Sequence, residues 1–520
     1  MANKTLFNSF QNILPVADTV NNAGGVAYNL DDKSALAQFC LTGVFRNTFY
    51  TQDKDQLSTV TQLLKKVNDP VFVGQVAVYA RKHGFMKDTP ACLLAWLASK
   101  SSDHSNDVLR AVFPIVIDNG KMLRNFVQMV RSGVFGRKSL GSLPKKLIQK
   151  WFRLHDGEYV FKNSIGNDPS MVDVIKLSHP RPNNQEMNAL FGYLLGKEYD
   201  YKSLPICVRE YEEFKKDTSI EVPNIPFQFL ASLDIPEKTW MKIAMNGGWH
   251  MVRMNLNTFN RHGVFKSKKM VEYIADKLRN VDEIKKSKVF PYQLLAAYQN
   301  ANDVPMEIKL ALQDAMEVAI ENVPVFGENV FVLPDVSGSM HSPITGYGRC
   351  HTSKMRCIDV AGLFAASILR TTPTAQVLPF AERVKPLVLN PRDSVMSNTQ
   401  KLANLGGGGT NCSAPLEMIL NSNSKVDTII YVSDCESWMD NPSYRSTSSM
   451  DVWKKIKRKN KNAKCICIDV TPNITTQMKE NTDVLNIGGF SDQIFNVIDG
   501  FVKNDHSTLV GTIEKIRWSE

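Results

Sequence analysis

The sequence lacks the features that would place it in a membrane or outside the cell. No apolar run reaches the length of about 18 residues that a membrane-spanning helix needs. The first 22 residues hold one lysine and no long apolar stretch, so we expect no secretory signal. The nine cysteines are odd in number, and no two stand in a CxxC spacing. These absences predict a soluble, cytoplasmic protein with buried, reduced thiols and no membrane partner.

Acidic residues are also in short supply. The chain has 62 Lys and Arg against 52 Asp and Glu, a formal net charge of +10. The excess is clustered, because residues 101–150 hold nine basic and three acidic side chains and residues 251–300 hold ten and four. Residues 326–520 are nearly balanced, at 21 against 19. Clustered basic charge is typical of a protein whose partner is anionic.

Strand-like alternation is almost absent between residues 33 and 320. Apolar positions recur at helical spacing, as in Leu57, Val60, Leu63 and Leu64, and the segments are about 12 residues long with short turns between them. Antiparallel helix pairs stacked side by side bury such faces, which predicts a repeat of the HEAT or armadillo type. An irregular all-α domain is the alternative, because no strict sequence period is present. The expected helices include 53–66, 107–118, 121–131, 143–154, 183–195, 204–215, 270–277 and 307–321.

The pattern changes after Pro324, where short apolar strands alternate with helices. Strands are expected at 329–333, 375–380, 428–432, 464–470 and 483–487, and helices at 353–369, 412–420, 450–459 and 492–502. This alternation predicts a doubly wound, mainly parallel sheet. We therefore divide the chain into an arm (1–24), a helical repeat (25–325) and an α/β domain (326–520).

Three loops of this α/β domain carry a set of oxygen ligands. Asp335 ends the first strand, and Ser337 and Ser339 follow it in the next loop. Thr410 follows a run of four glycines, and Asp434 comes directly after another strand. In a parallel sheet these loops meet at one edge. Two carboxylates and three hydroxyls suit a hard divalent cation, with Mg²⁺ expected. A zinc site at Cys350, His351 and Cys357 is a weaker alternative, because no second ligand pair accompanies them.

This motif resembles the metal-ion-dependent adhesion site of von Willebrand A domains. The resemblance implies that Ser337, Ser339 and Thr410 bind the metal directly, whereas Asp335 and Asp434 act mostly through water. Three neutral hydroxyls leave the cation under-neutralised, so it would retain affinity for an acidic oxygen of a partner protein.

The helical part has its own resemblance, carried by three stretches. These are Gln38–Phe45, Val174–Pro182 with its Leu-Ser-His core, and Gly248–Leu256 followed by Gly263 and Val264. Together with the A-type domain they resemble the Ro autoantigen family, whose helical part is the TROVE module. The family implies a ring-like HEAT-type helical repeat followed by a von Willebrand A-type doubly wound sheet. Its members bind noncoding Y RNAs on the outer face and single-stranded 3′ ends of misfolded RNA in the central hole.

Candidate RNA contacts follow from the resemblance and from the charge map. Lys162 and His179 align with basic positions of the family's outer surface, whereas Gly166 and Met254 stand where the family has basic residues. For each residue chosen by charge, a solvated surface side chain is the alternative. The full candidate set is Arg137, Lys138, Lys145, Lys146, Lys162, His179, Arg181, Arg253, Arg261 and Lys266.

The leading hypothesis is a ribonucleoprotein component that binds Y-like RNA and 3′ ends of misfolded RNA in RNA quality control. Under this hypothesis we expect two further partners, an exoribonuclease and a protein that offers an acidic residue to the metal site. The alternative is a metal-dependent protein-adhesion scaffold without an RNA role. A hydrolase is disfavoured, because no acidic cluster for two metals and no evident general base accompany the site.

Overall fold

The chain forms two compact units, each built from several segments of the sequence. The structure is a computed structural model that describes residues 14–42, 45, 52–287, 289, 291–301, 303–321, 323–344, 354–439, 446–471, 473–489, 493–503 and 508–518. The A unit comprises Met1–Val67, Phe290–Gln299 and Met316–Thr512. The helical unit comprises Asn68–Val289, Asn300–Ala315 and Ile513–Glu520. The sequence-based division differs, because it assigns residues 25–67 to the helical repeat.

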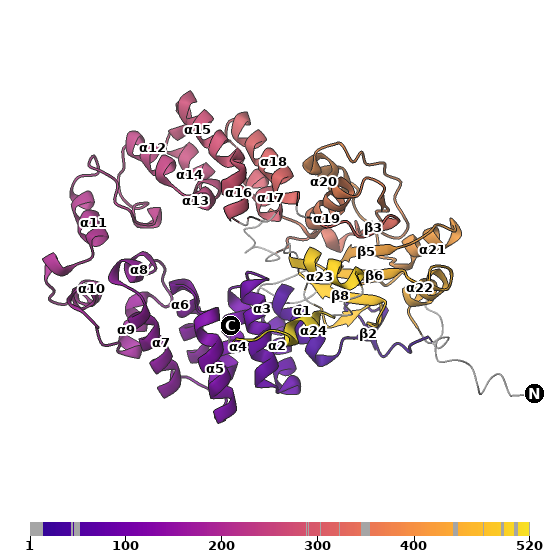
Figure 1. Cartoon of the computed structure of the whole chain (residues 1–520), viewed down its shortest axis with the longest axis horizontal. Helices are drawn as coiled ribbons and strands as arrows, with labels where there is room; N and C mark the ends of the chain where they lie inside the picture. The colour runs from indigo at the N-terminus through magenta and orange to yellow at the C-terminus, as the bar shows by residue number, and fades with distance from the viewer. Residues whose placement is uncertain are drawn as a thin grey trace, which may run out of the picture. The chain divides into compact units, whose positions relative to one another are not determined.

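The helical unit is a succession of short helices in which near neighbours along the chain pack on one another (Figure 1). Asp69 caps α3 by accepting hydrogen bonds from the amides of Val71 and Phe72, and Pro70 lies in the first turn, where its missing amide hydrogen costs nothing. The helices are α3 (Pro70–Lys82), α4 (Asp88–Ser99), α5 (Asp103–Val116), α6 (Gly120–Arg131), α7 (Ser142–Leu154), α8 (Gly157–Lys162), α9 (Met171–Ser178), α10 (Gln185–Leu195), α11 (Ile206–Lys216), α12 (Glu237–Asn246), α13 (Trp249–Met254), α14 (Leu256–Arg261), α15 (Lys268–Arg279) and α16 (Val281–Ser287). Helix α18 (Met306–Ile320) passes from this unit into the A unit.

The A unit is built around a five-stranded sheet of order β4-β3-β5-β6-β8 in which all neighbours are parallel. The strands are β3 (Val330–Pro334), β4 (Gln376–Val377), β5 (Thr428–Ser433), β6 (Lys464–Asp469) and β8 (Val484–Gly488). The helices of the unit are α1 (Asp32–Thr42), α2 (Asp53–Val67), α17 (Pro291–Asn300), α19 (Cys357–Thr371), α20 (Val395–Ala403), α21 (Ser413–Asn421), α22 (Ser448–Lys459) and α23 (Gln493–Val502). Helix α24 (Leu509–Glu514) begins in this unit and ends in the helical unit. The predicted architecture, a helical repeat followed by an A-type parallel sheet, is confirmed; ring closure stays a prediction.

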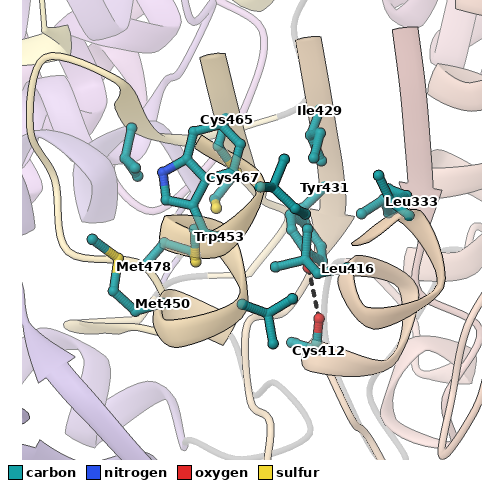
Figure 2. Packing of buried hydrophobic residues seen from close by; sticks show 14 of the residues in the cluster. Leu333, Cys412, Leu416, Ile429, Tyr431, Met450, Trp453, Cys465, Cys467 and Met478 are labelled. Carbon is teal, nitrogen blue, oxygen red and sulfur yellow. Dashed lines mark hydrogen bonds between the residues drawn. The ribbon is translucent and has the colours of Figure 1, made fainter. Parts of the chain in front are cut away.

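Alternate residues of each strand face opposite layers of helices. On one face, Tyr431 and its neighbours pack against Leu416 of α21 and Trp453 of α22 (Figure 2). The Tyr431 hydroxyl donates a hydrogen bond of 2.6 Å to the carbonyl oxygen of Cys412, so its polar end is satisfied inside the core. Helix α19 covers the other face and contacts β3 and β5. Burial on both faces explains why these strands read as continuous apolar runs.

The N-terminal segment joins the A unit through a second, small sheet that the sequence analysis does not predict. Strands β1 (Thr19–Val20), β2 (Val26–Asn29) and β7 (Thr475–Thr476) are antiparallel, and helix α1 packs against β8. Tyr28 is fully buried, and its hydroxyl lies 2.6 Å from Ser446 Oγ. Strands of two to four residues carry too little pattern to be recognised from sequence.

Several predicted boundaries shift by a few residues. Helix α5 begins at Asp103, four residues earlier than expected, because Ser102 accepts a hydrogen bond from the Ser105 amide as its cap. Asp88 lies in the first turn of α4, and Lys87 stands at the N-cap without a side-chain hydrogen bond. Helices α8, α9, α12, α13 and α14 are not among the expected ones, and each of the five has only six to ten residues.

The structure bears on two of the expectations that were drawn from features the sequence lacks, namely membrane-spanning segments and disulfides. Within the described part of the chain, no helix is long and apolar enough to cross a membrane. The eight described cysteines are all buried, and none of them forms a disulfide with another described cysteine; that they are reduced stays a prediction. Cys350 and His351 lie outside the described residues, so the zinc alternative is untested there.

Candidate metal centre and nucleic-acid interface

The first of the three loops begins where β3 ends. Asp335 and Ser337 are fully buried, and Ser339 is 6% exposed. The Ser337 amide donates a hydrogen bond of 2.8 Å to Asp335 Oδ1, which folds the loop back over the carboxylate. The hydroxyl oxygens of Ser337 and Ser339 lie 3.2 Å apart. The loop therefore brings two hydroxyls and a carboxylate together at the carboxyl edge of the sheet.

The glycine-rich second loop packs directly against the first. Gly407 and Gly408 have φ of 87° and 109°, backbone conformations that side chains disfavour, which explains the run of glycines before Thr410. The Gly338 amide donates to the Gly408 carbonyl oxygen over 3.0 Å, and the Gly407 amide donates to Val336 over 3.2 Å. Thr410 is 2% exposed. The second loop is thus tied to the first by its backbone.

Asp434, after β5, completes the set. The neighbouring Ser433 hydroxyl donates a hydrogen bond of 2.7 Å to Asp335 Oδ2, and the Ser339 hydroxyl hydrogen-bonds Asp434. The amides of Trp438 and Met439 donate to the Thr410 carbonyl oxygen, each over 3.1 Å. All three predicted loops therefore converge, although no direct contact of the Thr410 hydroxyl with the other four residues is seen.

The electrostatics of this site suit a cation. Burial raises the pKa of Asp335 to about 7, and the charge of Asp434 adds to that rise. Burial likewise raises the pKa of Asp434. Among the described Lys and Arg residues, none forms an ion pair with either carboxylate. Two buried carboxylates without a cationic partner are costly, and a bound divalent cation would relieve that cost. The oxygen-only donor set fits Mg²⁺.

Two further buried carboxylates lie near the site, and sequence analysis missed both. Glu436 is fully buried and accepts hydrogen bonds from Asn22 Nδ2 (2.7 Å) and the Ala23 amide (3.3 Å). Asp469, at the end of β6, accepts a hydrogen bond of 3.0 Å from Gln38 Nε2. Burial raises the pKa of Glu436 to about 7 and that of Asp469 well above its ordinary value. The N-terminal segment thus covers acidic groups beside the candidate metal site.

In the helical unit, basic side chains gather on α7 and the end of α9. Lys146, Lys150 and Arg153 recur at i, i+4 and i+7, so they share one face of α7, and all three are exposed. Helix α7 contains no acidic residue. Gln149 Nε2 donates to the carbonyl oxygens of Ser178 (2.8 Å) and His179 (3.4 Å), which fastens the end of α9 to α7.

This arrangement places the exposed His179 and Arg181 beside the basic face of α7. His179 ends α9 in a left-handed conformation, with φ of 50°. We call the residues Lys146, Lys150, Arg153, His179 and Arg181 the α7–α9 basic surface. Lys150 and Arg153 were not among the predicted contacts, yet the helical spacing from Lys146 would have indicated both.

The other predicted RNA contacts differ in what their side chains interact with inside the protein. The Arg137 guanidinium donates to the Ala98 carbonyl oxygen, and Lys162 forms an ion pair with Glu158 within α8. Lys266 pairs with Glu237 over 3.2 Å, and Arg253 lies over the Trp249 ring at 5.9 Å. Lys138 and Arg261 are exposed, and Lys145 is half-buried. Hydrogen bonds and ion pairs within the unit therefore give several predicted contacts a structural role as well.

Gly166 and Met254, the two departures from the family pattern, have different surroundings. Gly166 has φ of 113°, and a Cβ there would lie 2.6 Å from an Arg124 guanidinium nitrogen. The left-handed backbone therefore disfavours a side chain at this position, and one could be accommodated only if Arg124 moved. Met254 is 72% exposed, so its position is open to a longer residue.

The fold defines the class of this protein: a TROVE-type helical repeat joined to an A-type domain. Residues 330–502 match the family described as the Ro60 vWA domain, and residues 237–354 match the TROVE domain. The chain is 23% identical to RNA-binding protein RO60 of Deinococcus radiodurans, over 93% of this chain and 95% of that protein. RNA-binding protein RO60 of Caenorhabditis elegans is 25% identical over 33% of this chain and 27% of its own length.

The fold has a solved counterpart as well. The crystal structure of the Deinococcus radiodurans RO (RSR) protein superposes with a TM-score of 0.64 at 20% identity, covering 91% of this chain and 100% of that one. The chain belongs to the Ro autoantigen family.

Proposed function

We propose that this protein binds RNA through the α7–α9 basic surface. The observation that carries the proposal is the row of three exposed cations on α7, held beside His179 and Arg181 by the hydrogen bonds of Gln149. Such a row suits a polyanionic backbone, whose binding is largely sequence-tolerant and weakened by salt. The names of the relatives from Deinococcus radiodurans and Caenorhabditis elegans support RNA as the ligand.

In finer terms, we propose a noncoding-RNA-binding ribonucleoprotein component that acts in RNA quality control without catalysis of its own. A Y-like RNA would occupy the α7–α9 basic surface, and single-stranded 3′ ends of misfolded RNA would be the second ligand class. An exoribonuclease partner would act on ends presented in this way. Gly166 removes one basic side chain that the family has on its outer surface, so we expect weaker phosphate contact there.

The test is an RNA titration at two salt concentrations, with Mg²⁺ present. The RNAs are a structured RNA with a single-stranded 3′ tail and the same RNA with a blunt end. The triple variant Lys146→Ala, Lys150→Ala, Arg153→Ala should bind at least about tenfold more weakly and show a shallower salt dependence. Three exposed lysines of the same unit, Lys197, Lys202 and Lys238, replaced by alanine, provide the matched control. Equal losses in both triples, or no binding of either RNA at low salt, would rule the proposal out.

For the A unit we propose a divalent-cation site, with Mg²⁺ as the ion. Ser337, Ser339 and Thr410 would hold it directly, and Asp335 and Asp434 through water. When bound, the cation would offer an open position to an acidic oxygen of a protein partner. The converging hydroxyls of Ser337 and Ser339 and the two buried carboxylates support this proposal. If the protein binds no RNA, this site makes a protein-adhesion scaffold the better description.

A further inference from the structure

The A unit contains a cavity of about 690 Å³ between α22 and the loop of residues 481–483. Most of the charged side chains that line it are cations, and none of them belongs to the α7–α9 basic surface. Lys454, Lys457 and Arg458 come from α22, and Lys461 follows the end of that helix. Asp483 is the only carboxylate among the lining residues, which leaves an excess of three positive charges around the cavity.

The cavity is held open by interactions of Asp483 with two lysines. Lys457 Nζ lies 2.8 Å from Asp483 Oδ1 and also donates to the Ala463 carbonyl oxygen over 2.8 Å. Lys464 Nζ lies 3.6 Å from the same carboxylate oxygen and donates to the Thr482 carbonyl oxygen over 2.8 Å. The Lys457 contact thus fastens the loop to α22, and the Lys464 contacts fasten it to β6.

The other lining cations are Lys454, Arg458 and Lys461. Lys454 and Arg458 are four residues apart, so they share one face of α22 and lie about 6 Å apart along its axis. Burial lowers the pKa of Lys454, and the nearby charge of Arg458 lowers it further. Arg458 and Lys461 are exposed. Like charges gathered around a hollow are stabilised by an anion with more than one charged group.

The apolar residues that line the cavity are too buried to anchor a protein partner, which favours a nucleic acid as the ligand. Met450 and Trp453 are each only 2% exposed, because their side chains belong to the core of the A unit. A protein ligand needs exposed aromatic or aliphatic side chains as anchors, and these two offer almost no area. Phosphates need only the cations and polar groups such as Asn481 and Thr482.

We propose that the α22 cavity is a second RNA site, where the phosphates of a single-stranded segment bind Lys454, Arg458 and Lys461. The site goes beyond the proposed function, because it lies in the A unit and uses none of the residues of the α7–α9 basic surface. RNA bound at both places would touch both compact units of the chain.

The first experiment is photocrosslinking of the full chain to a 12-nucleotide single-stranded RNA that carries 4-thiouridine. We expect crosslinks in the segments 450–461 and 481–483. The triple variant Lys454→Ala, Arg458→Ala, Lys461→Ala should lower their yield at least about fivefold. The control triple Lys385→Ala, Arg392→Ala, Lys425→Ala removes the same charge from the A unit outside the cavity and should leave the yield unchanged. Absence of crosslinks at α22 overturns the proposal.

The second experiment is the salt dependence of binding of the same RNA. Loss of three phosphate contacts should make the slope of log affinity against log salt shallower by about 2, given about 0.7 per phosphate of a single strand. The single variant Lys461→Glu, outside the helix, should weaken binding even if the triple variant folds poorly. Either of two results would assign the cavity to another ligand. One is that polyglutamate binds as tightly as the RNA, and the other is that inorganic phosphate displaces the RNA at equal charge concentration.

The two proposals fail separately. Crosslinks at α22 that persist in the Lys146, Lys150, Arg153 variant would leave the cavity site standing without the α7–α9 basic surface. Loss of binding in that variant, with no crosslinks at α22, would leave only the proposed function.

Discussion

The side-chain amide of Asn22 donates a hydrogen bond of 2.7 Å to Glu436 Oε1, and the same amide lies 3.1 Å from Asn473 Oδ1. Asn473 in turn donates to the Asp434 carbonyl oxygen over 2.7 Å. The N-terminal segment is therefore connected to the loop that carries Asp434 by a short chain of hydrogen bonds. Because Glu436 is fully buried, the loss of one partner leaves a poorly solvated carboxylate.

Asn22→Ala should lower the free energy of unfolding of the A unit by about 1–3 kcal/mol, the usual cost of a buried acceptor without its partner. Chemical denaturation followed by the fluorescence of the A unit's tryptophans measures this change. Asn404→Ala, at the exposed end of α20, is the control and should be nearly neutral. Equal effects of the two changes would show that the Asn22–Glu436 contact contributes nothing.

Thr410→Val keeps the shape of the side chain but removes the hydroxyl. We expect the fold to persist, because the Thr410 contacts with the third loop are made by its backbone carbonyl. If the hydroxyl binds the cation, Mn²⁺ affinity measured by electron paramagnetic resonance should fall at least about tenfold. Thr399→Val, which changes a buried threonine of α20 outside the three loops, should leave the affinity unchanged.

Arg137 and Lys138 are adjacent in sequence, yet we expect opposite behaviour from them. Arg137→Ala removes a hydrogen bond to the Ala98 carbonyl oxygen and should destabilise the helical unit by about 1–2 kcal/mol. Lys138 is exposed, so Lys138→Ala should change stability by no more than about 0.5 kcal/mol. Thermal unfolding of both variants decides between them. A stable Arg137→Ala variant with weakened RNA binding would instead make Arg137 a direct contact.

Glu480 gives stability a pH dependence whose sign can be stated. Burial raises its pKa from 4.5 to about 7, and the charge of Asp31 adds to that rise. Between these two values the unfolded chain loses a proton that the folded chain keeps, so stability falls as pH rises from about 4.5 to 7 and levels off above that. Glu480→Gln should therefore be more stable than the wild type at pH 8, by about 1–2 kcal/mol, and equal to it at pH 4.

Urea unfolding at the two pH values measures this difference. The magnitude is less than the full shift would give, because Glu480 stays partly exposed to water. Glu417→Gln, an exposed carboxyl on α21, is the control. A Glu480→Gln variant that gains the same stability at pH 4 as at pH 8 would contradict the prediction.

The convergence of the three loops could be predicted from sequence because parallel strands fix where loops meet. The five candidate metal ligands all follow strand ends or precede helices, so the sheet topology alone brings their loops to one edge. They are Asp335, Ser337, Ser339, Thr410 and Asp434. Asp469 obeys the same rule at the end of β6, and the predicted strand 464–470 would have allowed its inclusion. Asn22 and Gln38 follow no such rule, because their contacts span more than 400 residues.

In the helical unit, sequence reasoning located the basic charge but not its partners. The spacing of Lys146 and its neighbours predicts a shared helix face, which the structure contains. It could not show that Arg137 binds a backbone carbonyl or that Arg124 occupies the space beside Gly166, because both contacts join separate elements. Short helices such as α8 and α13 have six residues each, too few for a periodic pattern.

The A unit contains Met1–Val67 and Met316–Thr512, so its first part is synthesised long before its last part. Helix α1 emerges early, yet the strand it packs against, β8, is among the last parts to be made. Helix α2 is available to α1 at once, but Gln38 and Thr42 of α1, which lie beside Gly488 of β8, stay without that neighbour while the helical unit is translated. The nascent chain thus carries an incompletely packed helix that ribosome-associated chaperones would need to shield until the C-terminal part arrives.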